Sequence, residues 1–520
     1  MDEKASLLRP SRRQVLAYGA GAAGILSLGP FLEACASGST NTGPKRGGIL
    51  KFAVGDGQSK DTLDPARAVT AMPIVGGGML YDNLLSMDIN WKLTPALAED
   101  YSASGDVMTW TFKLRKGVQF HNGQPLTVDD VKAQFARVLD KKTSPSGYGT
   151  FHEVLDSSGI SAPDASTIKF SLKIPDAFFG VKVAHYAVHI PQAGITDWIK
   201  GAIGTGPFKL KSFEPGTGFE FVRNPNYWQS GAPLLDGINC VNIPDQATKA
   251  QAVLTGDVDV ATEVAAATWS QFDSSSTATL LDLQSYSPFT FDIDTSIKPY
   301  SDPKVSQAMK MMLDRSKMLS IVVKGKGVVS ADSLIPPTDP YYPSDLKPYP
   351  FDPEKAKSLL ASAGYASGFK DDIWTTTAYP FLDEGAAFGK QGWAAGKLDM
   401  TIQSVSNDDY INAFLNKPIV MDYYLRLHPV GMFEQYYASG PNNTARLKDT
   451  QIDDWIKQIK ATKDEAKQKQ IAGEILHRYN ETAALIVPFH FSTLWPHKKR
   501  VGGITINPMF NIDFRTVTLG

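Results

Sequence analysis

The stretch that decides the fold runs from Tyr81 to Lys132 and reads YDNLLSMDINWKLTPALAEDYSASGDVMTWTFKLRKGVQFHNGQPLTVDDVK. Within it, residues 109–114 alternate polar and apolar side chains, as a half-buried strand does. Lys116-Gly117 turns the chain, and Thr127-Val128-Asp129-Asp130 forms a capping box ahead of a helical run. The pattern predicts a strand, a turn, a strand, a loop and a helix in that order.

This order of residues closely resembles the bacterial family 5 extracellular solute-binding proteins, the peptide, oligopeptide and nickel receptors of ABC importers. The resemblance lies in four runs: Pro95-Ala96-Leu97-Ala98-Glu99, Phe112-Lys113-Leu114-Arg115-Lys116-Gly117-Val118, Phe120-His121-Asn122-Gly123, and Leu126-Thr127 before Asp129-Asp130-Val131. It implies a two-lobed α/β periplasmic-binding-protein fold, type II, of the large peptide-receptor kind. Lobe I would carry an extra subdomain, and two strands would form the hinge between the lobes.

The composition is that of an ordinary globular protein. With 520 residues, 42% hydrophobic, the chain can bury large cores and should divide into more than one lobe. A formal net charge of −2 gives no reason to expect nucleic acid as a partner. Only two cysteines are present, which excludes a disulfide framework or a cysteine metal cluster.

The first 35 residues are typical of an export signal. Ser11-Arg12-Arg13-Gln14-Val15-Leu16 precedes a Gly/Ala-rich run and resembles a twin-arginine signal, although an ordinary secretory signal would also fit. Leu32-Glu33-Ala34-Cys35 resembles a lipobox, which makes Cys35 a candidate lipidation site. Residues 36–45 would then be a flexible tether, and the alternative is a cleaved signal with a frayed terminus. We expect a periplasmic or otherwise extracytoplasmic protein.

Further landmarks place the two lobes. The family resemblance assigns residues 46–290 and 490–520 to lobe I, residues 86–200 to its inserted subdomain, and residues 291–489 to lobe II. Strands are predicted at 47–54, 219–222 and 287–294, with Phe289, Phe291 and Ile293 on one face. We expect the chain to cross between the lobes near 286–294 and to return near 485–491.

Helix signals accompany these strands. Asp302-Pro303 and Asp352-Pro353 each combine a capping residue with proline at the first helical position. The run from Gln246 to Leu254 predicts a helix that ends at Gly256, and a long polar helix is predicted over 463–481. The loop after the first strand would face the cleft between the lobes, which makes Gln58, Ser59 and Asp61 ligand candidates.

The most informative chemistry lies in Ile419-Val420-Met421-Asp422-Tyr423-Tyr424-Leu425-Arg426-Leu427-His428-Pro429. Interpreted as one strand, this run places its odd-numbered residues on a core face. The other face would then carry Val420, Asp422, Tyr424, Arg426 and His428. Peptide-binding relatives carry an aspartate here, shortly before a proline, that holds the peptide's amino terminus. Alignment on Pro429 puts Leu425 or Arg426 at that place, and neither is an acid.

Arg426 therefore suggests an anionic or carboxylate-bearing ligand, because a guanidinium offers paired donors to a carboxylate. Its partner would be either such a ligand or Asp422 on the same predicted face. Other ligand candidates are Tyr437 and Asn442 in a polar loop, together with Trp393, Trp374 and Tyr379.

No catalytic motif stands in the chain, and its eight histidines show no ligand spacing. We expect no enzyme activity, no cofactor and no metal. The expected function is an extracytoplasmic receptor, a monomer, that captures a small solute and delivers it to an ABC permease and ATPase. The alternatives are a di- or oligopeptide-binding protein and, in another class, a periplasmic chaperone or enzyme on the same scaffold.

Overall fold

The computed structural model describes residues 45–88, 90–376, 379–406, 409–410, 413, 416–506 and 512–520. The predicted export signal, Cys35 and residues 36–44 of the tether lie outside this range. Within it, no helix has both the length and the apolar character that crossing a membrane requires.

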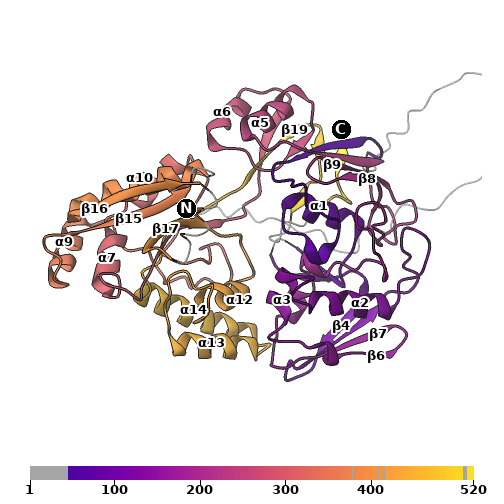
Figure 1. Ribbon diagram of the computed structural model, residues 1–520, viewed down its shortest axis with the longest axis horizontal. Coiled ribbons are helices and arrows are strands. Elements are labelled where there is room, and N and C mark those ends of the chain that lie inside the picture. Colours follow the sequence, from indigo (N-terminus) through magenta and orange to yellow (C-terminus); the bar gives the residue numbers. More distant parts are fainter. Residues whose placement is uncertain are drawn as a thin grey trace, which may run out of the picture. The chain divides into compact units, whose positions relative to one another are not determined.

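Lobe I is built on a seven-stranded sheet in the order β12-β19-β11-β1-β10-β9-β8. Central strand β1 pairs in parallel with β10 and β11, while the outer pairs are antiparallel. The sheet thus joins strands from the beginning of the described chain to β19 near its end (Figure 1). The strands are β1 Ile49–Val54, β8 Phe208–Glu214, β9 Gly218–Arg223, β10 Gly237–Asn242, β11 Val260–Ala261, β12 Ala278–Asp282 and β19 Leu494–Lys498.

Lobe II is built on a six-stranded sheet in the order β14-β18-β13-β17-β15-β16. Phe289, Phe291 and Ile293 of β13 are fully buried together, as their alternation predicts. The strands are β13 Ser287–Ile293, β14 Gly327–Val329, β15 Phe369–Thr376, β16 Leu398–Val405, β17 Ile419–Tyr423 and β18 Ile486–Phe491.

The opening stretch of the sequence contributes β4 and β5 to a separate four-stranded sheet, β4-β5-β7-β6, with its own buried core. The strand at 109–114 and the Thr127–Asp130 capping box are confirmed. The strand predicted after the turn is wrong: only an isolated bridge joins Gln119 to Pro125. The elements are β2 Leu85–Met87, β3 Leu93–Pro95, β4 Ala98–Ala103, β5 Thr109–Leu114, β6 Ile160–Asp164, β7 Thr167–Ser171, α2 Val128–Val138, α3 Pro145–Phe151 and α4 Phe179–Lys182.

The remaining helices begin and end largely at the predicted signals. Asp302 and Asp352 accept hydrogen bonds from backbone N–H groups in the first turns of α7 and α9. Gly256 ends α5 in the left-handed conformation, at φ 94°. These helices are α1 Ala71–Leu80, α5 Gln246–Thr255, α6 Ser270–Asp273, α7 Pro303–Met311, α8 Arg315–Val322, α9 Pro353–Ser362, α10 Pro380–Trp393, α12 Pro429–Met432, α13 Thr450–Lys460 and α14 Glu465–Thr482. Short strands β20 Val501–Gly502, β21 Thr505–Ile506, β22 Ile512–Asp513 and β23 Thr518–Leu519 follow β19.

Two chain segments join the two large sheets. The chain leaves the first sheet after β12 and enters the second at β13, and it returns between β18 and β19. The two segments are bonded to each other: the Thr493 N–H donates to Ser285 Oγ at 2.9 Å, and the Leu283 N–H donates to the Thr493 carbonyl at 3.1 Å. Gln284 and Tyr286 on either side of Ser285 adopt positive φ values of 46° and 47°.

Candidate ligand-binding site

Strands β13 and β17 of lobe II bring two aspartates to one face of the sheet. The strands are antiparallel, with Thr290 opposite Asp422 and Asp292 opposite Val420. Directly opposite residues share a face, as do alternate residues of one strand. Asp292 and Asp422 therefore lie on the same face, while Phe291 and Met421 point into the apolar core on the other.

Tyrosines surround this acid pair. The Tyr424 hydroxyl donates to Asp292 and lies 3.0 Å from Thr444 Oγ1. The Tyr410 hydroxyl bonds Asp422 Oδ1 and the Met421 carbonyl, each at 2.8 Å. The ring of Tyr436 stands 4.5 Å from that of Tyr424. Asp292 is only 4% exposed, whereas Asp422 is partly exposed, so Asp422 is the accessible carboxyl of the pair.

Neither carboxyl is neutralised by an ion pair with a described lysine or arginine. Burial raises the pKa of Asp292, and burial together with the charge of Asp292 raises the pKa of Asp422 well above its ordinary value. The charge of Arg446 acts on Asp292 from a distance, but its guanidinium pairs with Asp294 and bonds the Lys417 carbonyl. The face is thus an acidic, aromatic surface with capacity for a cation.

The C-terminal end of β17 lies beside the segments that join the two lobes. Burial raises the pKa of Tyr423, and so do Tyr379 and the more distant charge of Glu263. Tyr423 pairs with Phe289 near the start of β13, and its ring lies 6.0 Å from that of Phe491 at the end of β18, next to the two segments that join the lobes. The acid pair therefore lies beside a junction between the two lobes.

Beyond Tyr423 the predicted strand is wrong. The ladder pairs Tyr423 with Phe289, so the next residue stands opposite Pro288, which has no N–H to donate. Past Pro288 the neighbouring strand turns away at Tyr286, which has a positive φ. Strand alternation ends there, and Leu425, predicted to face the core, is 50% exposed.

Arg426 has an internal partner, but it is Asp339 rather than Asp422. Its Nη2 lies 2.9 Å from Asp339 Oδ2, and both side chains are largely buried, at 11% and 1% exposure. The guanidinium also lies over the ring of Trp91, 5.6 Å from its centroid. Because β17 ends at Tyr423, Arg426 leaves the face that carries Asp422.

His428 also lies away from the acid pair. Its ring contacts those of Trp91, Phe178 and Tyr341, with centroids 4.9 to 5.5 Å apart. Burial lowers the pKa of His428 to about 3, so the ring is neutral at ordinary pH.

The candidates in lobe I lie at the end of β1. Gln58 and Ser59 are exposed in the loop that follows it. Asp61 is buried and engaged, because it accepts hydrogen bonds from the Gln58 N–H at 2.8 Å and from the Thr70 hydroxyl at 2.7 Å. Asp61 therefore shapes the loop that presents Gln58 and Ser59.

The remaining candidates in lobe II do not gather at the acid pair. Trp393 is fully buried and donates to the Met309 carbonyl at 3.0 Å. Tyr437 is buried and its hydroxyl accepts from the Leu334 N–H at 2.9 Å. Asn442 is exposed. Lys417 Nζ lies over the ring of Trp374, 4.3 Å from its centroid. Of these aromatic candidates, Tyr379 comes nearest, with its ring 5.4 Å from that of Tyr423.

Asp292 and Tyr410 are site residues that were not predicted from the sequence. Asp292 could have been found, because it lies on the opposite face of its strand from Phe289, Phe291 and Ile293, the side on which Asp422 was predicted. Tyr410 carried no such signal, since it reaches Asp422 from outside the sheet.

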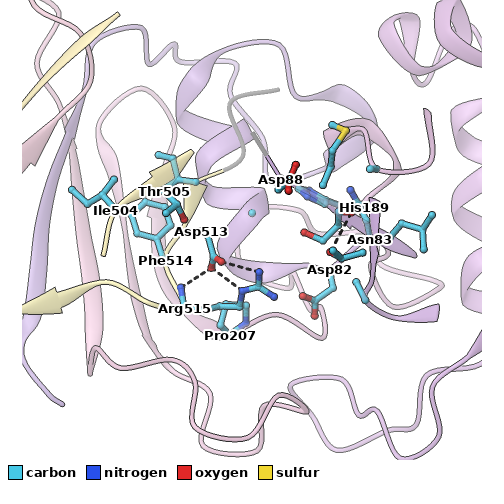
Figure 2. A pocket seen from close by; sticks show the side chains of 18 of the residues that line it. Asp82, Asn83, Asp88, His189, Pro207, Ile504, Thr505, Asp513, Phe514 and Arg515 are labelled. Atoms are coloured by element: carbon cyan, nitrogen blue, oxygen red, sulfur yellow. Dashed lines mark hydrogen bonds and ion pairs between the residues drawn. The ribbon is translucent and has the colours of Figure 1, made fainter. Parts of the chain in front are cut away.

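A pocket of about 480 Å³ lies within lobe I at the end of α1 (Figure 2). Asp82 and Arg515 in its lining already have hydrogen-bond partners within the protein. Asp82 accepts from Thr205, Tyr227 and Trp228, each at 2.9 Å, and Arg515 bonds both carboxylate oxygens of Asp513. Its lining holds none of the predicted ligand residues, so the acid pair remains the stronger candidate. Among the described residues no group of His, Cys, Asp or Glu is arranged to hold a metal.

Comparison with known proteins identifies the family of this chain. The chain belongs to the bacterial extracellular solute-binding proteins, family 5, whose middle region matches residues 92–431. It is 26% identical over 486 residues to the glutathione-binding protein GsiB of Escherichia coli (strain K12), covering 89% of this chain and 93% of that protein.

Solved structures agree on the two-lobed fold. The periplasmic binding protein AgaA from A. tumefacien R10, in complex with agropinic acid, has a TM-score of 0.77 at 25% identity, covering 91% of this chain and 99% of that one. DppA from Helicobacter pylori, an ABC transporter-associated periplasmic binding protein in complex with peptide STSA, has a TM-score of 0.76 at 24% identity, with 91% and 98% covered. The protein is a solute-binding receptor of an ABC importer, and its family is one of transport proteins that act outside the cytoplasm.

Proposed function

We propose that this receptor captures a small solute that carries a primary ammonium group, such as a short peptide, and that Asp422 holds this group. The observation that carries the proposal is the Asp292–Asp422 pair, which is buried among tyrosines without an ion-paired cation in the described chain. An ammonium would supply the missing positive charge and three donors.

The position of Asp422 fits this role. It is the partly exposed member of the pair, and it stands next to Tyr423 at the end of β17, beside the segments that join the lobes. A ligand that bridges both lobes binds the closed form better and shifts the population toward it. The relatives that bind glutathione or the peptide STSA accept ligands with a free amine. This is the di- or oligopeptide alternative, with Asp422 as the amine partner.

A carboxylate-bearing ligand is a second proposal, favoured by Arg426. Its Nε is buried and has no hydrogen-bond partner in the part of the chain that the structure describes. A carboxylate that reached this atom would satisfy it. Arg426→Ala should then weaken binding of glutathione more than binding of its carboxyl-amidated form, and equal losses would contradict this second proposal.

Further properties of the receptor belong to the proposal. Export through a twin-arginine signal and lipidation at Cys35 would keep the receptor at the membrane surface beside its permease. We propose that it acts as a monomer, with lobe boundaries near residues 290 and 490. Its role is binding rather than catalysis.

The test of the ammonium site compares ligands that differ in one group. Titration calorimetry at pH 7.5 would use glutathione and the peptide Ser-Thr-Ser-Ala, each with a free and an acetylated amine. A buried charge pair is worth about 2–5 kcal/mol, so acetylation should weaken binding at least about thirtyfold. Equal affinity of the free and acetylated forms would overturn the proposal.

A matched pair of variants locates the site. Asp422→Asn should lose most of the preference for the free amine. Asp454→Asn changes an exposed aspartate of α13 and should leave the affinity unchanged. Retention of the preference in Asp422→Asn would move the ammonium site elsewhere.

A further inference from the structure

Two consecutive phenylalanines of the inserted subdomain pack into different lobes. Phe179 is fully buried in the subdomain's own core, where its ring contacts those of Trp110, Phe151 and Phe170. Phe178 instead belongs to a core cluster of lobe II and lies 4.9 Å from the ring of His428. The subdomain thus inserts one aromatic side chain into the opposite lobe.

The segment that carries Phe178 is held in place from within its own subdomain. Asp176 has a fully buried side chain, whose Oδ1 accepts from the Phe178 N–H at 2.9 Å. The Asp176 carbonyl accepts from Trp110 Nε1 at 3.0 Å. Next to it, the Ala177 N–H donates to the Lys460 carbonyl of α13 at 2.8 Å, across the lobe boundary. The backbone that meets lobe II is therefore already shaped for that contact.

An ion bridge runs beside Phe178. Lys182 Nζ lies 2.7 Å from Asp176 in its own subdomain and 3.2 Å from Glu434 in lobe II. Glu434 is also paired with Lys460 of its own lobe. When the lobes separate, Lys182 keeps Asp176 and Glu434 keeps Lys460, so neither lobe is left with a lone buried charge. The cross-lobe bond can therefore break and form again without leaving a buried charge unpaired.

Trp91 completes the contact from the turn between β2 and β3. Its φ of 64° is unusual for a large side chain, and its ring meets that of His428 edge-on at 5.5 Å. His428 is thus held between Trp91 and Phe178, two aromatic rings of the opposite lobe.

We propose that Phe178, Trp91 and Lys182 form a latch between the lobes, distinct from the hinge, which stabilises the closed receptor before any ligand binds. The latch raises the closed population of the free protein, and so raises the apparent affinity for whatever solute the cleft accepts. This inference does not depend on the ligand class proposed above.

The neighbouring phenylalanines provide the test and its control. Small-angle X-ray scattering would measure the radius of gyration of the purified receptor without ligand, and thermal denaturation would measure its stability. Phe178→Ala should lower the closed-to-open ratio by at least about tenfold and so enlarge the radius of gyration. Phe179→Ala should instead lower the melting temperature of the subdomain and leave the radius of gyration of the folded protein unchanged.

Lys182→Met gives a second measure of the same latch. It should also enlarge the radius of gyration of the free receptor. The double variant Lys182→Met with Glu434→Gln should enlarge it by less than the sum of the two single variants. Lys173→Met, which changes an exposed ion pair with Asp156 in the same subdomain, should have no effect. A radius of gyration unchanged in both Phe178→Ala and Lys182→Met would overturn the latch, whatever solute the receptor binds.

Discussion

At the scale of single residues, Asp292 and Asp422 owe their chemistry to their surroundings. Both are ordinary aspartates in the sequence, and both acquire a raised pKa because they are buried near each other. Such a pair destabilises the free protein, and a bound cation would relieve the repulsion between the two carboxyl groups.

The raised pKa values predict how stability depends on pH. Above about pH 4 an unfolded aspartate loses its proton, while the folded pair still holds one, so the unfolding free energy falls as pH rises through the raised pKa values. Asp292→Asn removes the part of this fall in unfolding free energy that comes from Asp292. We expect the variant to be more stable than the unmodified protein by about 1–2 kcal/mol at pH 8, with the difference shrinking toward pH 5.

Urea denaturation at pH 5, 6.5 and 8 would measure this difference. Asp454→Asn, at an exposed position, should have the same unfolding free energy as the unmodified protein at every pH. A constant gap between Asp292→Asn and the unmodified protein would show that Asp292 titrates as an ordinary aspartate.

At the scale of elements, local signals predicted helix ends better than strand ends. Asp302, Asp352 and Gly256 act on backbone groups within a few residues, so their sequence context suffices. The end of β17 depends on Pro288 and Tyr286, more than 130 residues away in the chain, and alternation alone extended the strand too far.

Gly256 offers a test at this scale. An added Cβ would lie 3.3 Å from Lys498 Cε, and the left-handed backbone at φ 94° disfavours any side chain. Gly256→Ala should lower the unfolding free energy by about 1–2 kcal/mol, measured by urea denaturation. Gly105→Ala, where a Cβ meets nothing within 4 Å, is the matched control and should be nearly neutral.

At the scale of the whole molecule, the two crossing segments act as one hinge because they are bonded to each other. Ser285 Oγ accepts from the Thr493 N–H at 2.9 Å and lies 3.0 Å from Thr493 Oγ1. Movement of one segment is therefore coupled to the other, as a hinge of a closing receptor requires.

Ser285→Ala should uncouple the two segments. Hydrogen exchange at the Thr493 amide is expected to accelerate about tenfold, because the amide loses its acceptor. Mass spectrometry of peptides covering 491–495 would measure it. Ser404→Ala, which removes an exposed hydroxyl bond to Asp383, should leave this exchange rate unchanged. An unaltered rate in Ser285→Ala would mean that the segments move independently.

The amino-acid sequence alone established the family by resemblance, predicted the positions of several strands and helices, and predicted the faces of β13 and β17 that enter the core. The predicted strands, faces and helix ends follow from periodicity and capping, which act over a few residues. The tertiary structure decided which side chains meet: Asp292 with Tyr424, Arg426 with Asp339, and Phe178 with the core of lobe II. The first two pairs are separated by 132 and 87 residues, and only the folded backbone brings their polar and aromatic groups within contact distance.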